Sequence, residues 1–288
     1  GDAYSAEMKE QTIETIKKDL GQVDMVIYSI AAPRRTAPDG VTYKSVLKTT
    51  GEAYTNRTID LRSNQLTEAT IEPATQEEIN NTIKVMGGED WILWIKALKD
   101  AGVLADGAKT VAYSYIGPEL TYPIYKEGSI GQAKKDLYAS ADKIQEEVDG
   151  VEAYVSVNKA VVTQSSAAIP IVPLYLAILF KVMKEQNVQE GCIEQMYRMI
   201  HDRLCNGGEV VTDENRLIRM DDWEMEPKVQ EAVAAIWEKI DQDNLEEVTD
   251  LEGYWQEFYE IFGFCIDGVD YSADVDADVQ IPSIAPVE

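Results

Sequence analysis

The feature that most constrains the fold is a helical pattern that runs directly into a nearly continuous apolar strand. Ser5 is a candidate N-cap for a helix whose apolar face carries Ile13 and Leu20. Gly21 ends this helix, and the β-rich run 23–30 follows at once. Because parallel strands need crossover connections, a helix joined to a buried strand by a short turn is half of a βαβ unit. The sequence therefore predicts an α/β fold built on a parallel sheet.

The start of the chain lacks the strand and the Gly-rich pyrophosphate turn that normally come before such a helix. There is also no initiator Met. We therefore expect the first strands of the sheet to lie outside this chain, and residues 1–288 to form a single incomplete domain. The acidic run Asp267–Asp278 is expected to be a loosely held surface segment within a C-terminal tail, residues 267–288.

The charge and the residue types exclude several classes of function. A net charge of −26 argues against nucleic-acid binding, although Arg34-Arg35 and Lys134-Lys135 form local basic clusters. Three scattered cysteines and one histidine, His201, give no disulfide framework and no metal site. His201 lies in a helical pattern without a nucleophile elbow, which argues against a Ser-His-Asp triad.

No membrane segment or signal peptide is predicted. The longest apolar run, 167–180, contains two prolines and is too short to span a bilayer. No positively charged segment leads into an apolar stretch at the start of the chain. We therefore predict a cytoplasmic protein with no membrane partner.

Three loops that follow strand-like runs are candidates for a ligand site, because ligands bind beyond the carboxyl ends of parallel strands. The segment 113–135 is opened by the strand-like run Thr110–Tyr115 and is rich in Gly, Pro and hydroxyl groups. The segment 161–168 is small and hydroxyl-rich. The segment 31–36 contains two arginines that could meet phosphates, but an ordinary solvated loop explains it equally well.

The pair Tyr125 and Lys134 is chemically interesting but awkwardly spaced. On one continuous helix, residues nine apart point to opposite faces and lie roughly 13 Å apart along the axis. Gly128 and Gly131 allow the helix to begin after Tyr125, with Ser129 as a candidate cap. A lysine ammonium beside a phenol lowers the pKa of the phenol from about 10. The spacing alone still favours two unrelated surface residues.

Other patterns predict the surroundings. Residues Glu52–Glu72 favour a surface β-hairpin with turn residues Asn56, Ser63 and Asn64. Thr75 and Glu78 form a capping box that opens a helix. Further helices are predicted over residues 132–148, 171–183, 193–204 and 227–237, and the segment Phe258–Phe264 is expected to close the core.

Several long motifs, in the same order, resemble the trans-2-enoyl-CoA reductase family, which includes the V-type enoyl-acyl-carrier-protein reductases. The resemblance covers essentially the whole chain. The segments that carry it are 26–36 (VIYSIAAPRRT), 84–91 (KVMGGEDW), 113–134, 162–170 (VTQSSAAIP), 218–223 (IRMDDW) and 262–271 (FGFCIDGVDY).

The resemblance implies an enlarged relative of the short-chain dehydrogenase fold. Such a fold has a doubly wound, Rossmann-type parallel sheet, with an added hairpin and helices over the substrate site. It also implies NADH-dependent reduction of the 2,3 double bond of a trans-2-enoyl-CoA, such as crotonyl-CoA, to the saturated acyl-CoA.

By the family pattern, Tyr125 donates a proton to the developing thioester enolate. Lys134 contacts the nicotinamide ribose and tunes the tyrosine, and Tyr115 contacts the substrate. The resemblance also implies a set of cofactor-lining residues, namely Asp2, Ala3, Ile30, Ala31, Val162, Thr163 and Gln164. Asp2 and Ala3 match the contact on the adenine side.

Alternatives remain open at this point. Enoyl-acyl-carrier-protein reduction for fatty-acid synthesis is one, although a net charge of −26 favours CoA thioesters over an acidic carrier protein. Another is a catalytically silent fragment that needs the missing first strands, because the Gly-rich loop and the acidic residue that selects NADH over NADPH are absent. The sequence does not determine the oligomeric state, and a monomer is the working expectation.

Overall fold

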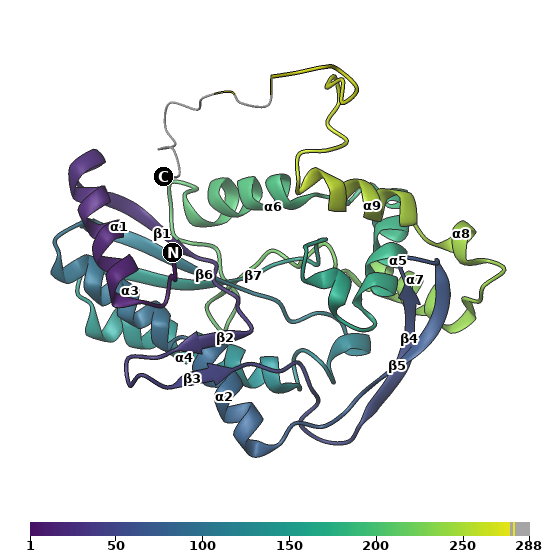
Figure 1. The fold of residues 1–288 in the computed structure, drawn as a ribbon, viewed down its shortest axis with the longest axis horizontal. Coiled ribbons are helices and arrows are strands. Elements are labelled where there is room, and N and C mark those ends of the chain that lie inside the picture. The colour runs from purple at the N-terminus through teal and green to yellow at the C-terminus, as the bar shows by residue number, and fades with distance from the viewer. Residues whose placement is uncertain (277–278, 280–288) are drawn as a thin grey trace.

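A parallel sheet forms the centre of the computed structural model, which describes residues 1–276 and 279 (Figure 1). The strand order within the described residues is β1-β6-β7-β8, and every neighbouring pair is parallel. The strands are β1 (Val23–Tyr28), β6 (Leu104–Ser114), β7 (Val151–Val157) and β8 (Leu217–Arg219). The predicted α/β fold with a parallel sheet is confirmed.

Helices cover both faces of this sheet. On one face, α1 (Ala6–Asp19), α3 (Glu89–Asp100) and α4 (Ser129–Glu147) enclose a core that includes the fully buried Trp91 and Ile144. On the other face lie α6 (Cys192–Arg198) and the π-helical turn η3 (Met199–Leu204). Figure 1 shows α6 on the upper side of the sheet and α4 on the lower side.

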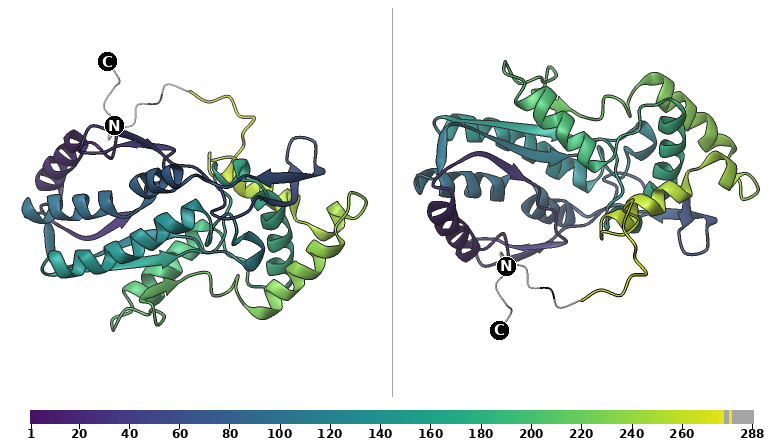
Figure 2. Two further views of the ribbon diagram at one scale, coloured as in Figure 1. Left: turned by 90° about the horizontal axis from the view of Figure 1, so that it is seen from below. Right: turned by 90° about the horizontal axis from the view of Figure 1, so that it is seen from above.

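A second, mostly helical core lies at the carboxyl ends of the strands, away from α1 in both views of Figure 2. Its centre is α5 (Val172–Glu185), in which residues 172–180 are all buried. Around α5 pack α7 (Pro227–Lys239), α8 (Leu245–Val248), α9 (Leu251–Glu260) and the hairpin of β4 (Tyr54–Asp60) and β5 (Gln65–Ile71).

The hairpin is fixed to α7 by polar contacts. Arg57 Nη1 donates to the Trp237 carbonyl at 2.6 Å, and Trp237 Nε1 donates to Asn56 Oδ1 at 3.2 Å. Asn56 therefore lies inside β4, and its prediction as a turn residue is wrong. The turn falls at residues 61–64, where Asn64 adopts a left-handed conformation with φ of +52°.

Most of the local helix signals are confirmed. Ser5 caps α1, and Thr75 with Glu78 forms the reciprocal capping box that opens α2 (Gln76–Met86). Pro227 is the first residue of α7. The remaining short elements are β2 (Arg34–Thr36), β3 (Thr42–Lys44), η1 (Glu119–Thr121) and η2 (Ser166–Ala168).

Near the C-terminus, Phe262 and Phe264 are about half exposed, at 49% and 53%. The prediction that Phe258–Phe264 closes the core is therefore wrong for Phe262 and Phe264, whereas Phe258 packs against the helical core, in which Tyr254 of α9 is fully buried. Of the predicted acidic tail, residues 267–276 and 279 are exposed, and the remainder lies outside the described residues.

The described residues contain neither a membrane-spanning helix nor a metal-binding cluster. No helix among them is both long enough and apolar enough to cross a membrane. The same residues contain no group of three or more His, Cys, Asp or Glu side chains arranged to hold a metal ion.

Candidate functional site

The candidate site lies where the strands end. Strand register places Ser114 beside Val157 and Val157 beside Arg219, so β6, β7 and β8 end at the same level. The residues that follow these strands therefore share one edge of the sheet, which is where parallel sheets bind ligands. Tyr115 comes directly after β6 and lies at this edge.

Two phenols meet at this edge. The rings of Tyr115 and Tyr125 contact edge to face, with centroids 4.9 Å apart and an angle of 86° between the planes. Tyr115 donates its hydroxyl proton to Glu224 Oε1 at 3.1 Å. The Tyr125 hydroxyl makes no hydrogen bond within the part of the chain that the structure describes. Tyr125 therefore has the phenol proton that is free for a ligand.

The position of Tyr125 depends on Gly131. α4 begins at Ser129, and the backbone carbonyls of Tyr125 and Lys126 lie against its first turn. A Cβ atom on Gly131 would overlap both carbonyl oxygens. The expectation that the helix begins after Tyr125 is confirmed, and Gly131 lets the backbone of residues 125–126 pack against the first turn of α4.

Ser129 is the first residue of α4 and does not cap it; Gly128 occupies the N-cap position. The Ser129 hydroxyl donates to the Val46 carbonyl at 2.6 Å and accepts from the Lys48 amide. It therefore ties α4 to the segment before the hairpin.

Lys134 reaches the same edge from α4, but it does not tune Tyr125 in the expected way. Its ammonium donates to the Tyr113 carbonyl at 3.1 Å, and burial lowers the pKa of Lys134 to about 8. The pKa of Tyr125 is raised, first by burial and second by the charge of Glu224. The predicted lowering of this pKa by Lys134 is therefore wrong, and Tyr125 stays protonated at neutral pH.

The predicted cofactor-lining residues fall into two groups. Asp2 lines a pocket of about 470 Å³ together with the loop after β1, which follows directly on Ile30 and Ala31. The backbone carbonyl of Ala3 accepts from Lys9 Nζ and Trp94 Nε1, which fixes the start of α1. The structure thus brings the start of the chain and the end of β1 together.

The second group follows β7. Val162 is 5% exposed and belongs to the helical core, whereas Thr163 and Gln164 are exposed. A reciprocal pair of contacts between Thr163 and Ser166 shapes this loop, since each residue's amide donates to the other's hydroxyl. The Val162 side chain is therefore enclosed by the core, whereas the side chains of Thr163 and Gln164 are accessible.

The two arginines after β1 differ in their surroundings, since Arg34 is exposed and Arg35 is buried. Arg34 is exposed and lines the 470 Å³ pocket. Arg35 is 2% exposed, and its Nη1 donates to the Lys84 carbonyl and to Glu89, both at 2.7 Å. Its Nε and Nη2 are buried without a hydrogen-bond partner, and Arg35 also lines the pocket.

A buried polar cluster around Glu224 was missed by sequence reasoning. Glu224 is fully buried and accepts from Tyr115, from Tyr175 at 2.6 Å and from the Ala160 amide at 2.7 Å. In the sequence it follows Asp221-Asp222-Trp223, which has the composition of an exposed acidic turn. The available signal was the family-like motif 218–223, which ends one residue before Glu224.

Comparison with known proteins gives two family-model matches. Residues 1–205 match a model described as the trans-2-enoyl-CoA reductase catalytic region. Residues 212–275 match one described as the enoyl reductase FAD binding domain. The second description mentions FAD, whereas the similar proteins and structures below are named with NADH or NAD.

Similar proteins cover almost the whole chain. A trans-2-enoyl-CoA reductase [NADH] of Ruminiclostridium cellulolyticum is 55% identical over 99% of this chain and 72% of its own length. An enoyl-[acyl-carrier-protein] reductase [NADH] of Cytophaga hutchinsonii is 53% identical with the same coverage. The crystal structure of Treponema denticola trans-2-enoyl-CoA reductase in complex with NAD aligns with a TM-score of 0.91 at 49% identity, over 96% of this chain and 69% of that one.

The role of Gly131 can be tested by Gly131→Ala. Because the new methyl group would overlap backbone atoms, we expect the free energy of unfolding to fall by about 1–3 kcal/mol. The matched control is Gly191→Ala, whose methyl group would meet only the end of the Glu194 side chain and should cost less. Equal losses in urea denaturation would contradict the close approach.

The burial of Lys134 predicts a pH-dependent stability. Its pKa is about 8 in the folded chain and 10.5 when unfolded, so the unfolded state binds more protons between these values. Lys134 therefore makes the free energy of unfolding rise with pH in this window, by roughly 1.4 kcal/mol for each pKa unit separating the two states. Denaturation from pH 7 to 10.5 should show this rise in wild type relative to Lys134→Met.

The control for this measurement is Lys135→Met, which changes the exposed neighbour on the same helix. The difference between wild type and Lys135→Met should stay flat with pH. A flat difference for Lys134→Met as well would show that the Lys134 ammonium is not desolvated in the folded chain.

Proposed function

This chain belongs to the trans-2-enoyl-CoA reductase family, and we propose that it reduces the 2,3 double bond of a trans-2-enoyl-CoA to the saturated acyl-CoA with NADH. The observation that carries this proposal is the pair of phenols at the carboxyl edge of the parallel sheet. Tyr125 has a free hydroxyl proton there, in ring contact with Tyr115. The names of the similar proteins support the substrate and the cofactor.

The residues present fit a dinucleotide. The two unpartnered guanidinium nitrogens of Arg35 in the pocket beside Asp2 are donors suited to phosphate oxygens. Ala31, which follows β1, is exposed and has a small side chain, so a flat group can approach it closely. Lys134 is assigned to the ribose next to the nicotinamide. Bound NADH supplies the hydride that is added to the β-carbon of the enoyl group.

The residues of this chain stabilise the negative charge that hydride addition creates on the substrate. Negative charge develops on the thioester oxygen, and a hydrogen-bond donor already aimed at it stabilises the transition state. Tyr125 has such a donor, because its raised pKa keeps the phenol protonated at neutral pH. In this proposal Tyr125 passes its proton toward the enolate, and the α-carbon finally receives a proton to complete the saturated product.

The CoA thioester is favoured over the acyl-carrier-protein thioester by charge. A carrier protein is acidic, and a chain with a net charge of −26 would repel it unless a basic patch lay at the site entrance. The alternative, an enoyl-acyl-carrier-protein reductase, is supported by the name of the Cytophaga hutchinsonii relative. A third candidate is a chain that binds acyl ligands without turnover.

The finer fold description is part of the proposal. Helices on both faces of the parallel sheet support a doubly wound, Rossmann-type arrangement related to short-chain dehydrogenases. The hairpin β4–β5 and helices α5 and α7 would then form the added part over the substrate. The single domain over residues 1–288, the monomeric state and the cytoplasmic location stay predictions.

Tyr125→Phe tests the proton-donor role. Removing one donor from a site that stabilises an oxyanion typically lowers kcat by roughly 100- to 1000-fold, and we expect a loss of this order with crotonyl-CoA and NADH. Tyr154→Phe is the matched control, because Tyr154 lies within β7, before its carboxyl end, and donates its hydroxyl proton to Glu152. Similar kcat values for the two variants would rule out the role of Tyr125.

The carrier is tested by measuring NADH oxidation with crotonyl-CoA and with the crotonyl acyl-carrier protein. We expect a higher kcat/KM for crotonyl-CoA, and the rate with the carrier protein should rise with salt as charge repulsion is screened. The opposite preference would favour the carrier-protein reductase. Thermal stabilisation by NADH without turnover of either substrate would favour the silent fragment.

A further inference from the structure

We propose that Glu224 is the positioning residue of this site, which holds the hydroxyl proton of Tyr115 and so leaves Tyr125 as the phenol that donates to the substrate. This inference rests on the proposed function. Glu224 makes no hydrogen bond to Tyr125 or to any residue assigned to the cofactor. It acts on the site through Tyr115.

The hydrogen bonds of Glu224 fix the hydroxyl groups of Tyr115 and Tyr175. Its Oε1 accepts from Tyr115 at 3.1 Å and from Tyr175 at 2.6 Å, and its Oε2 accepts from the Ala160 amide at 2.7 Å. Gln230 Nε2 donates to the Tyr175 hydroxyl at 3.2 Å and to the Glu224 carbonyl at 2.7 Å. Because the Tyr175 oxygen already accepts from Gln230, its proton points to Glu224.

A buried carboxylate needs a nearby positive charge. Burial raises the pKa of Glu224, and the Tyr175 and Ala160 hydrogen bonds and the charge of Lys159 oppose that rise. Lys159 is 1% exposed, and its Nζ donates to the Ala160 carbonyl at 2.9 Å. The peptide groups of one residue, Ala160, thus link the ammonium to the carboxylate.

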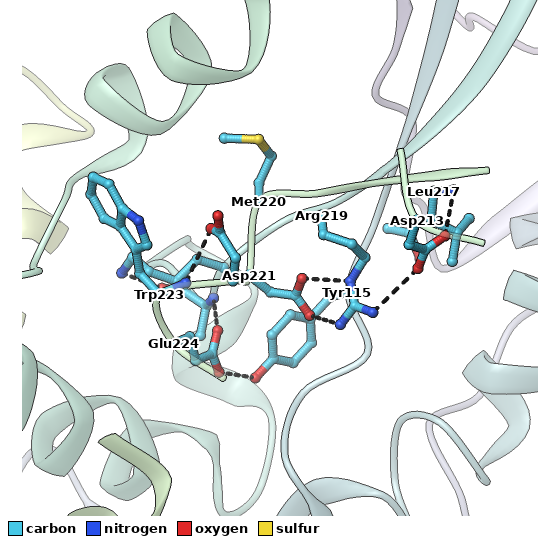
Figure 3. A network of polar contacts seen from close by, with 12 residues as sticks. Tyr115, Asp213, Leu217, Arg219, Met220, Asp221, Trp223 and Glu224 are labelled. Atoms are coloured by element: carbon cyan, nitrogen blue, oxygen red, sulfur yellow. Dashed lines mark hydrogen bonds and ion pairs between the residues drawn. The ribbon is translucent and has the colours of Figure 1, made fainter. Parts of the chain in front are cut away.

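The segment that carries Glu224 is held by two arginines, Arg219 and Arg198, and Figure 3 shows the contacts of Arg219. Arg219 donates from Nε and Nη2 to the two oxygens of Asp221, at 2.8 and 2.7 Å, and from Nη1 to Asp213. Arg198 donates to Asp222 and to the Met220 carbonyl, both at 2.8 Å. The backbone that leads to Glu224 is therefore fixed before any ligand arrives.

Arg198 also stacks its guanidinium on the Trp223 ring, 4.1 Å from the centroid, and Glu190 binds it with two hydrogen bonds. Because these contacts hold the segment that carries Glu224, its carboxylate does not reorganise when charge develops nearby. A phenol has a single proton, so the Tyr115 hydroxyl presents its lone pairs to the substrate. Tyr125 is left with the free proton in the ring pair.

The contact itself is tested by NMR of the chain labelled with [13Cζ]tyrosine, with the Tyr115 signal assigned through Tyr115→Phe. In Glu224→Gln the acceptor charge is lost, so we expect the Tyr115 signal to move and its titration to shift to lower pH. The Tyr122 signal should not move. An unchanged Tyr115 signal overturns the proposal, whether or not the chain reduces enoyl thioesters.

The catalytic consequence is tested by a double-mutant cycle on kcat with crotonyl-CoA and NADH. Misplaced groups cost up to roughly 100-fold in rate, and we expect a loss within this range in Glu224→Gln with a smaller change in KM. If Glu224 acts through Tyr115, the same change in the Tyr115→Phe background should cost nothing further. Independent, multiplicative losses overturn the positioning role.

A matched control lies near the amino end of β7, away from the strand ends that form the site. The half-buried Glu152 accepts the hydroxyl proton of Tyr154 at 2.7 Å, so Glu152→Gln also removes a carboxylate from a phenol. It should leave kcat nearly unchanged at temperatures where both variants are folded. If wild type shows no turnover, the proposed function fails, and the NMR experiment still decides whether Glu224 holds Tyr115.

Discussion

The geometry of the site depends on the hydrogen bonds of the buried Glu224 carboxylate. A charged group with no solvent contact is stable only when its oxygens are hydrogen-bonded and an opposite charge is near. Glu224 meets this need with Tyr115 from the segment after β6, Ala160 from the segment after β7 and Tyr175 from α5. It therefore joins the sheet to the helical core at the point where ligands bind.

This contact also joins the two regions that match separate family models. Tyr115, Tyr125 and Lys134 lie in the catalytic region, residues 1–205, whereas Glu224 lies in the second matched region, residues 212–275. The ion pairs of Arg198 and Arg203 with Asp222 connect the same two parts near the end of β8. The second region thus contributes to the site by orienting groups of the first.

Tyr125 and Lys134 do not act as a simple pair in which the ammonium lowers the pKa of the phenol. Burial and the Glu224 charge keep Tyr125 protonated, and burial also weakens the hold of Lys134 on its proton. Lys134 is oriented by the Tyr113 carbonyl, two residues before Tyr115. This contact uses one of the three ammonium protons, so Lys134 has further donors for a ligand.

The sequence by itself determined the local elements, because capping, periodicity and turn chemistry act within a few residues. Ser5, the Thr75 capping box and Pro227 placed three helix starts correctly, and the apolar run 23–30 gave the parallel sheet. Family-like motifs supplied Tyr125, Lys134 and Tyr115 as candidates. The glycines explained how a loop and a helix could approach each other.

The tertiary structure decided the protonation and the partners of those residues. Glu224 is 109 residues from Tyr115 and 49 from Tyr175, so no local pattern relates them. Its acidic neighbours in the sequence suggest an exposed turn, and only the packing of three strand ends and α5 buries it. The raised pKa of Tyr125 follows from its own burial and from the nearby charge of Glu224. Both effects depend on what surrounds the phenol in space.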